Sequence, residues 1–330
     1  MYYRALVATT MLPPAAALPD VLPTDRLTTT ARPVPEVRAS LRRIANLGNV
    51  CTVLGVWLQA ALTIELGVWL HHPLAWVVAF VLMGRTFARL GILGHEAAHR
   101  LLFSRKSVND FVGKWFLAYA GFTPIEAYRR SHMAHHKEEF GPEEPDMALY
   151  RGYPIAPDSF RRKLWRDATL RTGWKVRKPL LQLAWKRNPV ALQIVGVQVA
   201  IFLVFTAIGR PELYLFVWLL PEMSVWRVLN RLRAIAEHGG MTRSPDRRLT
   251  THHVRQSWLA RFWIVPYNTG WHLAHHVDIG IPWRNLPALH EELVASGWVT
   301  PQLEYPSYVA LWKALGSGEA RRISSQPAAL

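Results

Sequence analysis

Three short motifs, HEAAH, HMAHH and HLAHH, place eight histidines in this chain of 330 residues, and any fold must account for all of them. On an α-helix, residues four or three apart lie about 40° or 60° apart around the axis, so each motif presents its imidazoles on one narrow face. Neutral imidazole suits iron, zinc, copper and nickel and is the commonest protein metal ligand. Eight ligands are too many for one tetrahedral zinc ion, and they predict a cage around two metal ions. The eight residues are His95, His99, His132, His135, His136, His272, His275 and His276.

Two apolar segments in the first third of the chain predict a pair of membrane-spanning helices. Residues 50–70 form an apolar stretch that is long enough to cross the hydrocarbon core of a bilayer. A short turn at residues 71–73 separates it from a second apolar stretch, which starts at Leu74. Arg85 and Arg89 lie on one face of this second helix, so we expect its inner half to leave the bilayer and to continue into HEAAH.

Two further apolar segments predict a second pair of spans. Residues 191–208 form the third span, and residues 213–225 begin a fourth, in which Pro221 is expected to cause a kink. Half of all residues are hydrophobic and 15 are Trp, a composition that favours a membrane protein. The alternative is a soluble protein with these segments in its core, because the second is charged and the fourth is short.

Lysine and arginine are distributed unevenly among the loops, and this predicts the orientation. Residues 93–188 hold 18 of them, residues 231–330 hold 11 and the first 46 residues hold six, whereas the two opposite turns hold only Arg210. Basic loops stay on the cytoplasmic side, which places both termini and all three histidine motifs in the cytoplasm. The formal net charge of +16 is then mainly a membrane-face signal. No zinc-finger, RNA-recognition or basic-zipper pattern appears, so nucleic-acid binding is not expected.

Composition also suggests where the folded domain begins and ends. Residues 1–46 are predicted to be a mostly disordered, proline-rich N-terminal tail, with a secretory signal peptide as the alternative. Residues 311–330 are predicted to be a C-terminal tail, which leaves residues 47–310 as the membrane domain. Cys51 is the single cysteine, which excludes a disulfide framework, a CxxC zinc site and an iron–sulfur cluster. Any redox chemistry must therefore use the histidines and take its electrons from outside.

The motifs and their surroundings resemble the membrane fatty acid desaturase superfamily, whose members carry three histidine boxes. GHEAAHRLLF corresponds to the first box, YRRSHMAHHKEEFGPEEPD to the second and NTGWHLAHHVDIGIPWRNLPALH to the third, and the match covers roughly residues 50–292. AEHGG around His238 resembles the extra histidine that precedes the third box in many members. The three-residue spacer and the Glu of HEAAH resemble sphingolipid-type and rhizobitoxine-type bacterial desaturases.

The resemblance implies an all-α integral membrane fold, with four transmembrane helices in two hairpins and a cytoplasmic helical cap that holds two non-haem iron ions. It implies His238 as a ninth ligand, and a location in the bacterial inner membrane with the active site in the cytoplasm. The implied activity is that of an acyl-lipid desaturase, which introduces a C=C bond with O₂. No side-chain base can take a proton from an unactivated alkyl carbon, so an oxidant made from O₂ on iron is required. The chain lacks an HPGG-type haem segment, so electrons are expected from a separate ferredoxin-like protein with its reductase.

Four polar residues are candidates for orienting the ligands. A metal-bound imidazole needs an acceptor at its other ring nitrogen, which fixes its tautomer and its direction. Glu96, Glu237 and Asp278 each adjoin or nearly adjoin a proposed ligand, and Asn268 lies four residues before the third box. The alternative interpretation is that the acids lie on a solvated helix face and that Asn268 caps a helix.

The other histidines are not predicted to bind metal. His71 and His72 belong to the turn opposite the proposed metal site. His252 and His253 are adjacent in a polar stretch, so we interpret them as surface residues, and His290 is left out of the site.

Three other functions remain open. The runner-up is hydroxylation or ketolation of a lipid or carotenoid at the same site. HEAAH also matches the HExxH motif of zinc proteases, with Glu96 as general base. An intramembrane protease would require an Asp ligand from a later span, but the third and fourth predicted spans contain no Asp, and a protease leaves HMAHH and HLAHH unexplained. A non-catalytic metal carrier is the third alternative.

Overall fold

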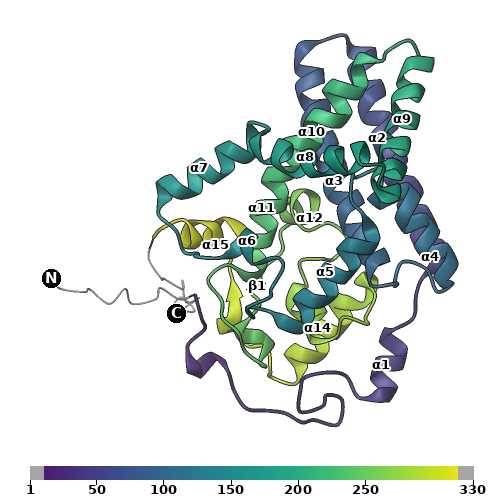
Figure 1. The fold of residues 1–330 in the computed structure, drawn as a ribbon. Helices are drawn as coiled ribbons and strands as arrows, with labels where there is room; N and C mark the ends of the chain where they lie inside the picture. Colours follow the sequence, from purple (N-terminus) through teal and green to yellow (C-terminus); the bar gives the residue numbers. More distant parts are fainter. Residues whose placement is uncertain (1–10, 319–330) are drawn as a thin grey trace.

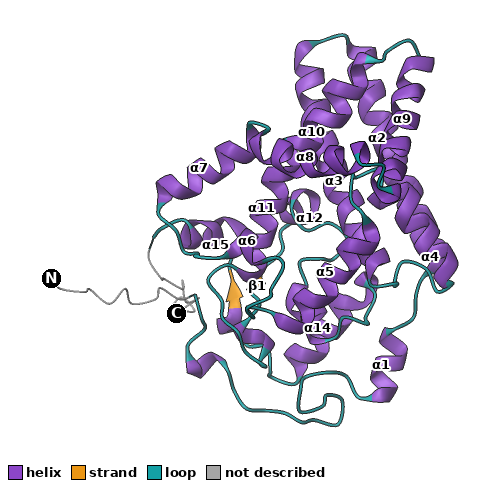
Figure 2. Ribbon diagram, in the orientation of Figure 1, coloured by secondary structure: helices purple, strands orange, loops and turns teal. Residues whose placement is uncertain are grey.

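The computed structural model describes residues 11–318, and most of this part of the chain is helical (Figures 1 and 2). The α-helices are α1 (Pro35–Leu41), α2 (Asn46–Leu70), α3 (Pro73–Ala98), α4 (Lys106–Val112), α5 (Ile125–Glu138), α6 (Met147–Tyr150), α7 (Pro157–Ala168), α8 (Arg171–Trp185), α9 (Pro189–Ala207), α10 (Leu220–Met223), α11 (Val225–His238), α12 (Trp258–Trp263), α13 (His272–Val277), α14 (Leu286–Ala295) and α15 (Tyr308–Leu315). The 3-10 segments are η1 (Ala15–Ala17), η4 (Arg247–Leu249), η5 (Trp283–Asn285) and η6 (Pro301–Leu303), and the π-helical segments are η2 (Gly113–Ala118) and η3 (Tyr214–Leu219). The strands β1 (His253–Val254) and β2 (Glu304–Tyr305) pair in parallel.

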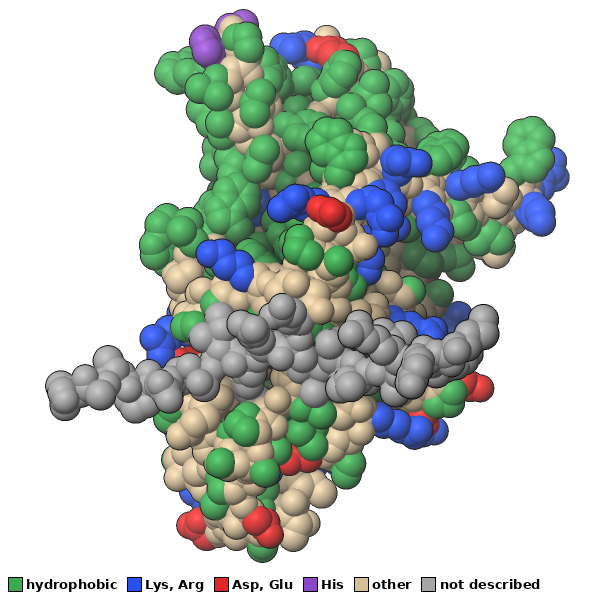
Figure 3. Space-filling model, turned by 90° about the vertical axis from the view of Figure 1, so that its left-hand side faces the viewer, with side chains coloured by type: hydrophobic (Ala, Val, Ile, Leu, Met, Phe, Trp, Pro, Cys, Tyr) green, Lys and Arg blue, Asp and Glu red, His purple; other side chains and the backbone are tan. Residues whose placement is uncertain are grey.

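Within the described residues, three helices are long and apolar enough to cross a membrane, namely α2, α3 and α9. Leu62 of α2 and Val204 of α9 are examples of large apolar side chains that these helices expose. A soluble monomer rarely exposes contiguous apolar surface on this scale, so the helices fit a lipid environment. In Figure 3, hydrophobic side chains cover the upper part of the molecule, with lysine and arginine gathered below them. Residues 11–318 are therefore consistent with the predicted all-α membrane protein.

The consecutive helices α2 and α3, where the first hairpin was predicted, pack against each other. His71 ends α2 in a left-handed conformation (φ 48°), and Pro73 occupies the first turn of α3, where its fixed φ favours helix initiation. With 26 residues, α3 is about 39 Å long and exceeds the ~30 Å hydrocarbon core of a bilayer. Its last turn carries His95, as expected for a helix that leaves the membrane and continues into the first box.

The predicted fourth span does not form one continuous helix. Residues 213–225 contain the π-helical η3, the short α10 and a non-helical residue, Ser224 (φ −123°, ψ −82°), before α11 begins. Pro221 lacks an N–H group for the helical ladder, and the π-helical turn lies just before it. The break expected at Pro221 thus falls three residues later, and none of the three helical pieces has spanning length by itself.

The N-terminal segment is packed where a mostly disordered tail was expected. Along residues 11–46, Leu27 and Val37 are buried in an apolar cluster with Leu289 of α14. The apolar residues of this segment are buried one at a time against other elements of the fold. They therefore need no helical spacing in the sequence. In Figure 1 it runs along the lower edge of the molecule before α1. Residues 1–10 lie outside the described part of the chain.

The predicted C-terminal tail begins inside a helix. Leu311 and Leu315 of α15 are fully buried against an apolar cluster that includes Ile235 of α11. The boundary expected at residue 311 therefore cuts through α15, and residues 319–330 lie outside the described residues.

Candidate metal centre

Four helix ends bring the nine candidate histidines together. His95 lies in the last turn of α3 and His99 follows as its C-cap residue, while His238 is the last residue of α11. The remaining six histidines lie on α5 and on the short α13. Glu126 in the first turn of α5 favours that helix, because a carboxylate complements the positive end of the helix dipole. The tight turn before α13 places Asn268 in the left-handed region (φ 58°).

The first group of imidazoles joins all three boxes. Ligand atoms of His95, His99, His132, His136 and His275 all lie within 4.8 Å of one another. The Nε2–Nε2 distances are 3.3 Å for His95–His99 and 2.9 Å for His99–His132. They are 3.0 Å for His132–His136 and 3.1 Å for His136–His275.

A second group adjoins the first. Ligand atoms of His135, His238 and His276 lie within 4.8 Å of one another. His272 joins them, because its Nε2 lies 3.1 Å from that of His238 and 3.0 Å from that of His276. The rings of His276 and His136 have centroids 4.4 Å apart, so the two groups are in direct contact.

The donor set fits metal ions. Nitrogen ligands at about 2.1 Å from one ion lie about 3 Å apart when they occupy neighbouring positions, as these Nε2 atoms do. Facing imidazole lone pairs repel each other unless a proton or a cation lies between them. Neutral nitrogen ligands in two adjoining groups therefore fit two first-row transition metal ions better than one.

Burial keeps these imidazoles in the ligand form. It lowers the pKa well below the ordinary value of 6.5 for His132, His136, His238, His272, His275 and His276. Burial also opposes protonation of His135, but the hydrogen bond to Glu144 and the negative charges of Glu144, Asp146 and Glu139 together outweigh it and raise the pKa. The six imidazoles with a lowered pKa thus favour the neutral form, in which histidine binds metal ions.

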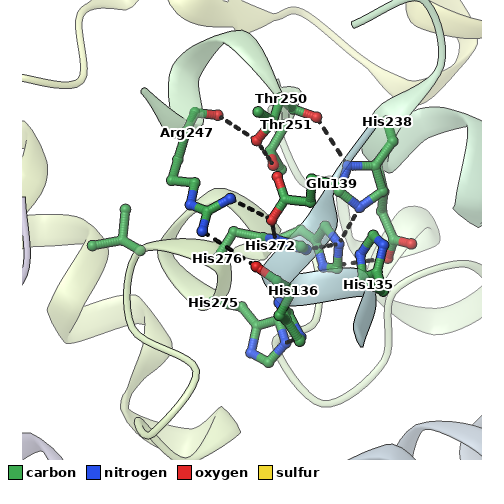
Figure 4. A network of polar contacts seen from close by, with 12 residues as sticks. His135, His136, Glu139, His238, Arg247, Thr250, Thr251, His272, His275 and His276 are labelled. Atoms are coloured by element: carbon green, nitrogen blue, oxygen red, sulfur yellow. Dashed lines mark hydrogen bonds and ion pairs between the residues drawn. The ribbon is translucent and has the colours of Figure 1, made fainter. Parts of the chain in front are cut away.

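Two carboxylates orient the histidines of the second and third boxes. His135 Nδ1 lies 2.8 Å from Glu144 Oε1, and His276 Nδ1 forms a short contact with Glu139. Arg247 Nη1 donates to Glu139 over 2.7 Å and holds this carboxylate in place (Figure 4). In both pairs the remaining nitrogen, Nε2, is left for a metal ion.

Sequence reasoning missed both carboxylates. Glu139 and Glu144 belong to the acidic run EEFGPEE, which follows HMAHH after Lys137 and was the available signal. Glu139 is the C-cap residue of α5, three residues after His136, so it lies at the same end of the helix. The third acceptor, the backbone carbonyl of Thr250 at 2.9 Å from His238 Nδ1, has no side-chain signature in the sequence.

The four predicted orienting residues lie in different surroundings. Glu237 Oε1 is 3.5 Å from His272 Nδ1, beside the second group. Glu96 Oε1 instead accepts the backbone N–H of Trp283 over 3.0 Å, and the Asn268 amide donates to the carbonyl of Trp283 over 3.3 Å. Glu96 and Asn268 thus bind the N–H and the carbonyl group of Trp283, and they hold this residue in the wall of the site.

Asp278 faces away from the histidines and toward the N-terminal segment. Its carboxylate accepts hydrogen bonds from the Arg38 guanidinium, one of them from Nη2 over 3.0 Å, and from the backbone N–H of Gly280 over 2.9 Å. It therefore ties the end of α13 to α1.

The expectation that His252 and His253 lie on the surface is wrong, because both are buried. His252 Nε2 lies 2.7 Å from the Gly239 carbonyl, and the His253 ring packs against His290 with centroids 4.5 Å apart. The polar sequence around them misled the prediction, since the parallel pairing of β1 with β2 covers this stretch. Neither residue belongs to the groups that could hold a metal ion.

A cavity of about 410 Å³ opens against the first group. His95, His272 and His275 line its metal side, and apolar residues such as Leu90 and Leu117 line much of the remainder. Thus apolar side chains lie directly beside a group of candidate metal-ligating nitrogens.

Comparison with known proteins agrees with this geometry. The sequence pattern of the family described as "Fatty acid desaturase" matches residues 67–308. The chain is 26% identical over 233 residues to dihydrorhizobitoxine desaturase of Bradyrhizobium elkanii, with 65% of each chain covered. It is 23% identical over 288 residues to the sn-1 oleoyl-lipid 12-desaturase of Anabaena variabilis, covering 80% of this chain and 66% of that one.

Similarity extends to a plant enzyme, the chloroplastic omega-6 fatty acid desaturase of Brassica napus, at 24% identity over 255 residues, covering 68% of this chain and 54% of that one. The chain thus spans about half to two thirds of the length of the curated relatives it matches. Since the family pattern covers all three histidine boxes and the cavity beside them, the chain belongs to the fatty acid desaturase family.

Proposed function

We propose that this protein is an O₂-dependent membrane desaturase that introduces a C=C bond into the acyl chain of a lipid at a di-iron centre. The observation that carries the proposal is the pair of adjoining histidine groups, from nine residues on four helices, beside one cavity that is lined in large part by apolar side chains. His95, His99, His132, His136 and His275 would hold one iron ion. His135, His238, His272 and His276 would hold the other.

The iron pair would supply the activation of O₂ that an unactivated C–H bond requires. The protein supplies orientation, because Glu139, Glu144 and the Thr250 carbonyl hold the outer nitrogens of His276, His135 and His238. We include Glu237 at His272 in this role. Glu96 and Asn268 would act indirectly, by positioning the backbone of Trp283. Asp278 would also act indirectly, by positioning α13.

The overall reaction removes two hydrogen atoms from neighbouring carbons of the chain. Together with two external electrons and two protons, O₂ becomes two molecules of water, and no oxygen atom remains in the lipid. The apolar wall of the cavity holds the chain and keeps bulk water from the reacting carbons, which limits side reactions.

We propose the inner membrane of a bacterium as the location, with four membrane crossings in two hairpins. α2 and α3 form the first hairpin, and α9 with the broken segment at residues 213–225 would form the second. The basic loops support a cytoplasmic position for both termini and for the metal centre. The electrons would come from a separate acidic, ferredoxin-like protein with its reductase.

Incubation of purified, iron-loaded protein with an acyl lipid, an electron donor system and ¹⁸O₂ tests the function. We expect an unlabelled product two mass units lighter than the substrate, and two iron ions per chain by metal analysis. Label in the lipid would instead assign the second candidate, a lipid or carotenoid hydroxylase or ketolase. One zinc ion per chain with peptide cleavage would support a protease. The contact between Glu96 and the Trp283 backbone argues against that role, because the carboxylate is already engaged.

A further inference from the structure

Three polar residues of α11 line the proposed substrate cavity, and one of them, Arg233, is tied to the metal centre through its ion pair with Glu237. They are Arg227, Asn230 and Arg233, which share one face of the helix because they are three residues apart. The Nε atoms of Arg227 and Arg233 are buried and lack a hydrogen-bond partner among the described residues. Each guanidinium pairs with a carboxylate through its terminal nitrogens, so one N–H of each group is left to bind a hydrogen-bond acceptor.

The surroundings of Arg227 carry excess positive charge. Two fully buried carboxylates, Glu222 and Asp167, are each shared by two guanidinium groups, so the network has a formal excess of two positive charges, one of them on the half-exposed Arg166. The ion pairs are Arg177–Glu222, Arg227–Glu222, Arg231–Asp167 and Arg166–Asp167. An anion beside Arg227 would offset this excess.

The charge around Arg233 differs, although Arg233 lines the same cavity. Its Nη1 binds both oxygens of Glu237 at 2.6 and 2.9 Å, and Asp146 also lines the cavity. Glu237 in turn lies beside His272. The carboxylates near Arg233 therefore lie on the side of the cavity that faces the metal centre. The positively charged end of the cavity is the end near Arg227.

The mouth of the cavity has the composition of a membrane interface. Val176 of α8 lines the cavity and is 44% exposed. Beside it α8 exposes Trp174 together with Lys175 and Lys178. Tryptophan and lysine favour the level of the lipid headgroups, so the Arg227 end opens where headgroups lie.

One helix sets the separation between this positive end and the metal centre. Arg227 and His238 are both on α11, eleven residues apart, which corresponds to about 16 Å along the helix axis. A lipid whose headgroup is held at Arg227 would therefore present the interior of its acyl chain to the histidines, rather than the carbons next to the headgroup.

We propose that Arg227, assisted by Asn230, binds a phosphate-ester anion at the head of the acyl substrate and so gives the enzyme a preference for anionic substrates. This proposal rests on the proposed function for the identity of the chain as substrate, but the headgroup interaction is measured by binding alone. The phosphate could belong to a bilayer phospholipid or to a soluble acyl-coenzyme A thioester, and the two sources are separated by the test.

The binding experiment uses the full chain in detergent, loaded with iron. The probes are phosphatidylglycerol, a neutral galactolipid with the same acyl chains, and an acyl-coenzyme A. For the wild type we expect tighter binding of phosphatidylglycerol than of the galactolipid. Arg227→Gln should weaken phosphatidylglycerol binding roughly ten- to a hundredfold, since a hydrogen-bonded charge is lost, and leave galactolipid binding within about twofold.

Arg166→Gln is the matched control, because Arg166 belongs to the same ion-pair network and does not line the cavity. Arg166→Gln should keep the wild-type preference for phosphatidylglycerol over the galactolipid, and Arg227→Lys should keep part of that preference. Melting temperatures without lipid show whether the variants are folded, and if Arg227→Gln is unfolded, the Arg227→Lys variant decides the test.

Tight binding of acyl-coenzyme A alone would assign the phosphate to the soluble source. Equal binding of charged and neutral lipids by the wild type, or an unchanged preference in a folded Arg227 variant, overturns the proposal. Because no turnover is required, these outcomes do not depend on desaturation.

Discussion

His135 donates its Nδ1 proton to Glu144 Oε1 across 2.8 Å, and the side chain of Glu144 is fully buried. This pair fixes the direction in which His135 Nε2 points, and Nε2 faces the second histidine group. An imidazole that receives such support is a better ligand, and loss of the acceptor typically lowers metal affinity about 10- to 100-fold.

We therefore expect Glu144→Gln to lower iron affinity by roughly this factor while the protein stays folded. Iron titration by competition with a chelator measures the change. Glu143→Gln is the control, since Glu143 is exposed and adjacent in sequence. Equal iron affinity in the two variants would contradict the role of Glu144.

Replacement of a ligand should have a larger effect. His275→Ala removes the third-box contribution to the first group, where His275 Nε2 lies 3.1 Å from His136 Nε2. We expect loss of desaturation and of part of the bound iron, measured by product analysis and metal content. His71→Ala is the control, because His71 is exposed in the turn between α2 and α3. A fully active His275→Ala protein would remove the basis of the di-iron proposal.

The stability of the metal-free protein should depend on pH. Burial lowers the pKa of six clustered histidines in the folded state, whereas in the unfolded chain they titrate near 6.5. Below pH 6.5 the unfolded state therefore binds more protons, and the free energy of unfolding falls as the pH falls. Thermal unfolding of metal-free protein at pH 7, 6 and 5 should show a steadily decreasing melting temperature. A constant melting temperature would mean that the imidazoles are not buried and neutral.

The contact between α1 and the end of α13 should hold the N-terminal segment in place. Arg38→Ala removes the guanidinium that pairs with the buried carboxylate of Asp278. We expect a destabilisation of about 1–3 kcal/mol, because a buried charge loses its hydrogen-bonded partner. Proteolysis within residues 11–46 should become faster. Arg43→Ala, at an exposed arginine nearby, should behave like the wild type.

Electron delivery should depend on ionic strength. With a net charge of +16 and its basic segments on the proposed cytoplasmic side, the protein would attract an acidic donor by electrostatic steering. The Debye length falls from about 10 Å at 0.1 M salt to about 3 Å at 1 M. Turnover at limiting donor concentration should therefore drop as salt is added, and a salt-independent rate would argue for a membrane-embedded donor.

Apart from His238, which the family resemblance implied, the ligands that the sequence predicted are those with a regular spacing. His132 and His136 lie four apart on α5, so the backbone geometry alone brings them to one face. Glu139 acts on His276, which is 137 residues away in sequence, and that contact depends on how α5 and α13 pack. Long-range pairs of this kind leave no local pattern, and neither does a backbone acceptor such as that of Thr250.

The fold shows the same division. The lengths of α2 and α3 follow from hydrophobicity and from the proline that starts α3. The burial of Leu27 and His253 does not, because each is covered by elements distant in the sequence. The polarity and proline content of the sequence around these residues predict that they are exposed, whereas tertiary packing buries them.

The continuity of α3 has a mechanical consequence. One unbroken helix connects the turn after His71 with His95 and His99, whereas the other two boxes lie on α5 and α13. A bilayer that is thinner or thicker than the apolar part of α3 changes the tilt of such a helix. A small rotation at the membrane end would shift the first-box nitrogens against the remaining ligands. The geometry of the iron pair would then respond to the thickness of the membrane, which is itself set by the acyl chains that a desaturase modifies.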